Sequence, residues 1–232
     1  MESSQRLTVE AQIYGILSQM YSSPEDTHTW CELVVALRQA FALLDVPCAI
    51  ESMEKIEAYL RDLPDTLPLA KEYVRLLRGP VRAVVYPYES LHIDGEVMGH
   101  STQAVLELYG EAGLGMSQDF RDLPDHISAE LEFMGYLCAK EAACVEDGDE
   151  SGHEHFGRLR RSFLDNHLLK WLPSFTGEII RNTVSPFYRD LAVATREFLS
   201  CQGITTSTLC SWSGLVRSTT TDSKFVLIDA GG

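Results

Sequence analysis

The chain lacks any long apolar run, and nowhere approaches the about 18 consecutive apolar residues that are typical of a membrane span. The sequence therefore predicts no transmembrane helix. The first residues, 1–6, also lack the basic start and the apolar core of a secretory signal peptide. These absences favour a cytoplasmic protein without stable membrane insertion.

Positive charge is scarce as well. The chain of 232 residues has 19 lysines and arginines against 34 aspartates and glutamates, which gives a formal net charge of −15. Binding to nucleic acid or to an anionic membrane needs clustered basic side chains that neutralise phosphates. The composition therefore excludes a general nucleic-acid binder, and it favours a cationic partner.

The familiar motifs of enzymes and metal sites are missing. The six cysteines form no Cys-x-x-Cys pair, so free thiols in a reducing compartment are expected. The sequence contains no glycine-rich phosphate loop, no His-Glu-x-x-His and no Gly-x-Ser-x-Gly, and no cofactor is expected. His153-Glu154-His155 suggests a metal at first sight, but histidines two residues apart do not share a helix face. We therefore predict no metal there, and a solvated loop.

Apolar residues recur at steps of three and four along most of the chain, which is the period of one helix face. The predicted helices cover about 7–21, 30–44, 50–61, 67–78, 101–109, 125–138, 153–171, 174–182 and 186–198. Gly79-Pro80 is expected to end one helix and Pro173 another, because proline cannot continue the hydrogen-bond ladder. Residues 81–100 are predicted to be a long ordered loop, and the acidic, glycine-containing residues 146–152 a linker.

The period of a strand is nearly absent, so the predicted fold class is all-α, with one helical domain over residues 1–201. Residues 202–232 are rich in serine, threonine and glycine, and form an irregular C-terminal tail in this prediction. Within the tail, residues 224–228 fit either a short strand or an interaction segment.

The first candidate site is the run Tyr86-Pro87-Tyr88-Glu89-Ser90. Aromatic rings, a proline and a carboxylate on a loop can form an apolar floor with one charged contact, which suits the capture of a peptide. The alternative is that the two tyrosines only hold a long loop against the core. Both interpretations stay open on composition alone.

The second candidate is the pair Asp125-His126 at a predicted helix start, with Glu130 about one turn further on. Such a pair can bind a cation, relay a proton or recognise a partner. It can also serve the helix alone, with Asp125 complementing the helix dipole. No serine, cysteine or second histidine lies at a spacing that completes a catalytic set, so the residues favour a binding protein over an enzyme.

Three segments carry a more specific pattern through their order and spacing. They are Glu-Tyr-Val-Arg-Leu-Leu-Arg-Gly-Pro at 72–80, the aromatic run at 86–90, and 124–134, which starts with Pro-Asp-His. Together they resemble the TorD/DmsD/NarJ family, the dedicated maturation chaperones of molybdenum-cofactor redox enzymes. The resemblance spans about residues 7–200.

The resemblance implies a TorD-like all-helical domain and a non-catalytic function in anaerobic respiration. Such chaperones bind the twin-arginine signal peptide, and sometimes the body, of an apo-molybdoenzyme. They hold it in the cytoplasm until the molybdopterin cofactor is inserted. The acidic charge fits a leader that carries two adjacent arginines and an apolar stretch.

The resemblance also assigns site residues. The family's Asp-His pair corresponds to Asp125 and His126, and its aromatic-Pro-Tyr-Glu loop corresponds to residues 86–90. With Glu130, these residues are expected to form the groove for the signal peptide.

Two other function classes stay open. One is a small nucleotide-binding protein, because some members of the family have been linked to guanine nucleotides, although this chain has no phosphate loop. The other is a helical adaptor that acts through the tail 202–232. The sequence does not name the client enzyme. A monomer and a domain-swapped dimer both fit, because the predicted linker 146–152 joins long helices.

Overall fold

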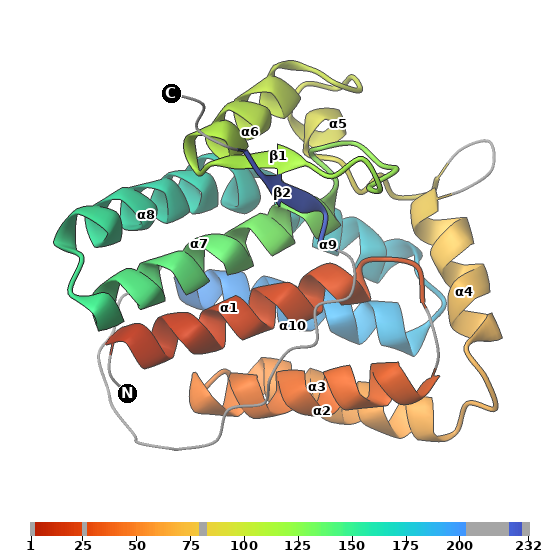
Figure 1. The fold of residues 1–232 in the computed structure, drawn as a ribbon. Coiled ribbons are helices and arrows are strands. Elements are labelled where there is room, and N and C mark those ends of the chain that lie inside the picture. Colours follow the sequence, from red (N-terminus) through yellow and green to blue (C-terminus); the bar gives the residue numbers. More distant parts are fainter. Residues whose placement is uncertain (1–2, 25–26, 79–82, 203–222, 229–232) are drawn as a thin grey trace. The chain divides into compact units, whose positions relative to one another are not determined.

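The structure is a computed structural model that describes residues 3–24, 27–78, 83–202 and 223–228 (Figure 1). Several expectations fall outside these residues. They are the helix stop at Gly79-Pro80, the thiol state of Cys210, and the form of the tail at 203–222 and 229–232.

The all-α class is confirmed: the described residues form ten α-helices, two short π-helical segments and one two-stranded sheet. None of these helices is long and apolar enough to cross a membrane. The chain divides into two compact units. The first unit comprises Met1–Ser18, Tyr88–Trp171 and Ser211–Gly232, and the second comprises Gln19–Pro87 and Leu172–Cys210. The expected single domain over 1–201 with a separate tail stays a prediction.

The second unit contains helices whose apolar stripes meet in a common core. Its elements are α2 (Thr27–Leu43), α3 (Pro47–Arg61), α4 (Leu67–Tyr73), a π-helical segment (Val74–Arg78), most of α9 (Leu169–Asn182) and α10 (Pro186–Gln202). Helix α3 packs against both α2 and α10. Trp30 lies 4.6 Å from Phe187, and Phe41 lies 5.8 Å from Phe198, between ring centroids. The apolar residues of α2 recur at steps of three and four from Trp30 to Phe41, and this spacing places them on the buried face.

The first unit carries most of the candidate residues. Its elements are most of α1 (Ser3–Met20), α5 (Glu89–Ile93), α6 (His100–Glu111), β1 (Leu114–Met116), α7 (Ile127–Asp147), α8 (Glu150–Phe163), a π-helical segment (Leu164–Leu168) and β2 (Phe225–Leu227). Helices α7 and α8 lie side by side (Figure 1). The core is aromatic: the Phe133 ring lies 4.6 Å from Tyr109 and 4.8 Å from Phe163. Each edge-to-face pair adds about 0.5–1.5 kcal/mol beyond the buried area.

The expected linker at 146–152 is wrong. Helix α7 runs to Asp147 and α8 begins at Glu150, so only two residues separate them. Gly148 adopts φ +70°, the left-handed conformation that ends a helix, and the Asp149 side chain accepts a hydrogen bond from Gly152 N at 2.9 Å. The glycine and the acid that suggested a linker are the caps of two helices.

The loop expected at His153-Glu154-His155 is also wrong, because all three residues lie in α8. The first histidine lies 3.7 Å from Glu141, between Nδ1 and Oε1. Within the described part of the chain, no group of three or more His, Cys, Asp or Glu side chains is arranged to hold a metal ion.

Pro173 does not end a helix, contrary to the prediction from the sequence. It lies inside α9, which continues to Asn182. The π-helical segment Leu164–Leu168 directly before α9 already alters the hydrogen-bond pattern. The proline therefore removes one backbone bond, while the buried side chains of Leu172 and Phe175 keep the helix in place.

The long loop expected at 81–100 is interrupted by α5, which begins at Glu89. Of the two alternatives left open for residues 224–228, the structure shows a short strand, β2, which pairs antiparallel with β1.

Candidate functional site

Asp125 fixes the start of α5 from a distant part of the sequence. Its backbone oxygen accepts a hydrogen bond from Glu89 N at 3.1 Å, and its Oδ2 accepts one from Ser90 N at 2.9 Å. The side chain is fully buried, with 0% exposed. Two otherwise unpaired amides of a short helix are thus satisfied by one residue, and this explains why α5 forms where a loop was expected.

His126 caps the N-terminus of α7. Its Nδ1 accepts a hydrogen bond from Ser128 N at 3.1 Å and lies 2.7 Å from Ser128 Oγ. Because Nδ1 is an acceptor, the ring proton lies on Nε2. Tyr109 Oη donates to the oxygen of Pro124 at 2.9 Å, which holds the turn that leads into His126.

Tyr88 is the half-buried residue of this cluster. It forms an antiparallel bridge with His126, and the two rings meet edge to face at 5.4 Å. Its hydroxyl donates to Asp122 Oδ1 at 2.8 Å. Asp119 is exposed and Asp122 is half-buried, so carboxylates lie along the segment that precedes α7.

A second set of buried polar groups lies next to Asp125. Glu89 is 1% exposed, and both its oxygens lie within 3.0 Å of His167 Nδ1. Glu130 is 0% exposed, and its Oε2 accepts a hydrogen bond from Trp171 Nε1 at 2.9 Å. Histidine and tryptophan are four residues apart, so one helical face presents both to the two glutamates.

The pKa of Glu130 is raised well above its ordinary value. Burial is the main cause of the raised pKa, and the charge of Glu89 and the hydrogen bond that protonated Glu130 donates to it add to the rise, while the bond from Trp171 opposes it. Asp125 makes a smaller contribution in the same direction. Burial and a neighbouring carboxylate both disfavour the charged form of Glu130.

Six of the eight predicted site residues therefore come together in the first unit. They are Tyr88, Glu89, Ser90, Asp125, His126 and Glu130. Tyr86 is half-buried and Pro87 is buried, and both belong to the second unit. Five of the six are buried and serve each other and the local backbone, and Tyr88 offers part of its surface.

The sequence alone did not identify His167, Trp171 and Asp122 as members of the cluster. The spacing of four between the first two was a detectable sign of a shared helix face. Their glutamate partners lie 78 and 41 residues away, so a local pattern does not identify the pairing.

Comparison with known proteins decides the family. Residues 47–177 match the family model described as nitrate reductase delta subunit. The chain belongs to this family. The matched residues include the whole buried cluster from Tyr88 to Trp171 and confirm the resemblance found in the sequence.

Curated relatives of this family member carry the names of chaperones. The selenate reductase assembly chaperone protein of Thauera selenatis is 45% identical over 73 residues, which covers 32% of this chain and 37% of the relative. The chaperone protein TorD of Shewanella amazonensis is 26% identical over 212 residues, which covers 78% of this chain and 84% of the relative. The chain thus spans just over a third of the first relative and most of the second.

A crystal structure of a candidate redox enzyme maturation protein from Archaeoglobus fulgidus is also similar. The two chains are 20% identical and superpose with a TM-score of 0.49. The match covers 86% of this chain and 95% of the Archaeoglobus chain.

Proposed function

We propose that this protein is a cytoplasmic chaperone for the assembly of a molybdopterin-dependent oxidoreductase. It binds the twin-arginine signal peptide and the apo form of the catalytic subunit, supports cofactor insertion and delays export. The observation that carries the proposal is the match to a TorD chaperone over 78% of the chain. The protein acts by binding, without turnover.

The proposed peptide surface is built around Tyr88. Its ring provides apolar area, and the carboxylate of Asp122, which accepts a hydrogen bond from the Tyr88 hydroxyl, provides negative charge for an arginine. Asp119, three residues before Asp122 in the sequence, is an exposed second carboxylate. Asp125 and His126 support this surface from below, because they hold the starts of α5 and α7.

The remaining predicted residues either offer no surface of their own to the peptide or precede Tyr88 in the sequence. Glu89, Ser90 and Glu130 are buried, and they contact His167, Asp125 and Trp171 within the same unit as Tyr88. Tyr86 and Pro87 directly precede Tyr88 in the sequence, and their part in peptide binding stays a prediction from the sequence. A cation that meets a partly desolvated carboxylate contributes more to specificity and to the rate of association than to raw affinity.

Titration of a synthetic leader tests this assignment. The leader carries two adjacent arginines and an apolar stretch, and its control carries two glutamines in place of the arginines. Asp122→Asn is expected to weaken leader binding about tenfold, because a charge-assisted bond is worth about 1.4 kcal/mol or more. Glu111→Gln, at an exposed position, is the matched control.

Two outcomes contradict the proposal. Equal affinity for the arginine and glutamine leaders would show that twin arginines are not recognised. Equal affinity of Asp122→Asn and Glu111→Gln would place any recognition away from Tyr88.

A further inference from the structure

Strand β2 lies on the first unit as a short extended segment with its own set of contacts. It pairs antiparallel with β1. Beyond the pair, Ser117 N donates to the oxygen of Lys224 at 2.8 Å, and Ile228 N donates to the oxygen of Gly113 at 2.9 Å. Extended peptides from other chains join sheets through the same main-chain bonds.

Glu132 on α7 holds the residues that precede β2. Its Oε1 accepts hydrogen bonds from Ser223 Oγ at 2.8 Å and from Lys224 N at 2.9 Å. Its Oε2 lies 2.8 Å from Lys224 Nζ, which also donates to Ser18 Oγ at 3.0 Å. One carboxylate thus recognises both the backbone and the charge of a basic residue in an extended segment.

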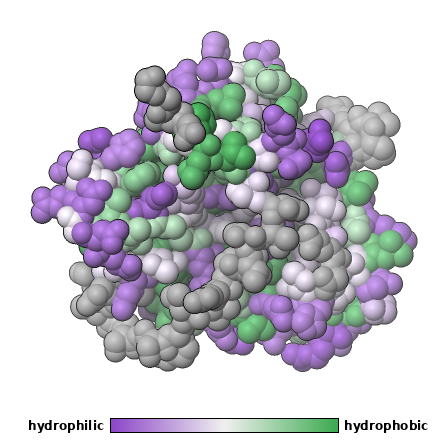
Figure 2. Space-filling model, viewed as in Figure 1, coloured by the Kyte–Doolittle hydropathy of each residue, from purple (hydrophilic) through white to green (hydrophobic). Residues whose placement is uncertain are grey.

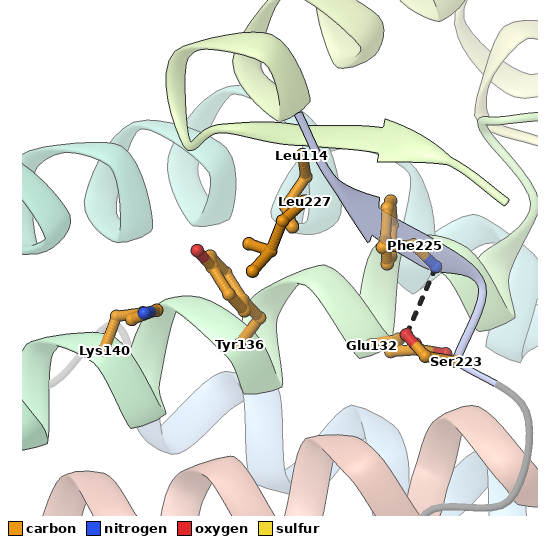
Figure 3. A pocket seen from close by; sticks show the side chains of 7 residues that line it. All are labelled: Leu114, Glu132, Tyr136, Lys140, Ser223, Phe225 and Leu227. Atoms are coloured by element: carbon orange, nitrogen blue, oxygen red, sulfur yellow. Dashed lines mark hydrogen bonds between the residues drawn. The ribbon is translucent and has the colours of Figure 1, made fainter. Parts of the chain in front are cut away.

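The residue after this lysine enters the aromatic core. The Phe225 ring is 8% exposed and lies 4.8 Å from Tyr109 and 6.2 Å from Phe133, between ring centroids. Beside it lies a pocket of about 240 Å³, whose wall includes Tyr136 and Leu227 (Figure 3).

The outer part of this ribbon stays exposed. Val226, Leu227 and Ile228 are 50%, 74% and 52% exposed. Apolar residues gather over the β1–β2 ribbon in the space-filling view (Figure 2). The tail segment therefore presents a cation and then four apolar residues, of which one is buried.

We propose that β1, Glu132 and the aromatic cluster of Tyr109 and Phe133 form a docking site for an extended peptide in which a cation directly precedes apolar residues. Residues 224–228 are its resident occupant, and the leader of the client displaces them. The net charge of −15 and the carboxylate of Glu132 complement such a peptide. The inference rests on the proposed function, because the leader of the client supplies the competing segment.

Lys224→Ala in the full chain tests the competition. The substitution removes the ion pair with Glu132 and leaves β1 and the aromatic cluster intact. The leader is expected to bind at least about fivefold more tightly, because its apparent affinity rises with the fraction of sites that the tail leaves vacant. Lys170→Ala removes the same charge from an exposed position and is expected to leave the affinity unchanged.

Glu132→Gln tests the carboxylate of the proposed docking site. The variant loses the charge that recognises the cation, so leader binding is expected to weaken at least about fivefold even though the tail is also released. Glu111→Gln is the matched control. Unchanged leader affinity in both Lys224→Ala and Glu132→Gln overturns the docking site.

A labelled peptide with the sequence of residues 223–228 separates this inference from the proposed function. We expect it to bind Lys224→Ala more tightly than the unchanged chain, and the leader to compete with it. If the peptide binds and the leader binds without competing, the inference fails and the proposed function stands. If the peptide binds and no leader binds to any variant, the proposed function fails as well. A dimer that dissociates in Lys224→Ala identifies a second copy of the chain as the occupant and overturns the inference.

Discussion

The Nδ1 atom of His167 lies 2.9 and 3.0 Å from the two carboxylate oxygens of Glu89. The two residues are 78 positions apart, and both side chains are buried. Their contact fixes α5 to the π-helical segment that leads into α9, and it lies beneath the proposed peptide surface.

Removal of the Glu89 carboxylate should therefore destabilise the protein strongly. Glu89→Ala leaves a buried histidine without its acceptor, and breaking a buried pair from one side costs about 3–5 kcal/mol. Urea denaturation, monitored by tryptophan fluorescence, measures the loss of folding stability. Glu96→Ala, at an exposed position, is the control, and an equal midpoint for the two variants would contradict the role of the pair.

The raised pKa of Glu130 predicts a pH dependence with a definite sign. The folded protein holds this proton above pH 4.5, where the unfolded chain releases it, so the contribution of Glu130 to stability is present at low pH and is lost as pH rises. Glu130→Gln resembles the protonated acid and can still accept the bond from Trp171. Its stability relative to the unchanged protein should improve by up to about 1.4 kcal/mol per pH unit above pH 4.5.

Urea denaturation at several pH values between 4 and 8 measures this difference, with about 0.3 kcal/mol taken as the smallest useful change. A difference between Glu130→Gln and the unchanged protein that does not vary with pH would show that Glu130 is ionised in the fold. Glu111→Gln should show no such trend, because its side chain is exposed.

The capping role of His126 predicts a rescue. His126→Ala should cost about 1 kcal/mol of stability, because an amide at the start of α7 loses its acceptor. His126→Asn supplies another good N-cap and should recover most of the lost stability. If leader affinity is also restored by asparagine, the histidine acts by positioning. Weak leader binding in a stable His126→Asn would instead show direct contact.

Glu72 predicts an acid-sensitive contact in the second unit. Burial raises the pKa of Glu72, but bonds from Arg75, Thr183 and Val184 outweigh burial, and the net pKa is lowered. Its contribution to stability is thus present above pH 4.5 and is lost as pH falls. Glu72→Gln should reduce the loss of folding stability that accompanies a fall in pH below 4.5. Glu54→Gln, at an exposed position, should lose stability with falling pH as the unchanged protein does.

The sequence predicted the helices well where the apolar periodicity is regular, as in α2 and α10. It failed where one residue had two plausible readings. Gly148 and Asp149 look like a linker in composition but cap two helices, and Pro173 looks like a terminator but is accommodated within α9. These outcomes depend on neighbouring turns and on packing, which composition does not record.

The candidate site shows the same limit. The sequence identified Asp125, His126 and Glu130, and the structure brings them together with Tyr88 and Glu89. It did not show that the acids are buried, because burial depends on partners such as His167 that lie far away along the chain. Polar residues at a helix start look alike in sequence whether they face a ligand or the backbone.

Capture of the tagged full chain from cells that make a molybdopterin-dependent reductase tests the central claim most directly. The account predicts recovery of the catalytic subunit with its twin-arginine leader still attached and without its cofactor. It also predicts that recovery falls when the two arginines of that leader are replaced. Recovery of no such subunit, or equal recovery of the cofactor-loaded form without its leader, would contradict a chaperone that acts before cofactor insertion and export.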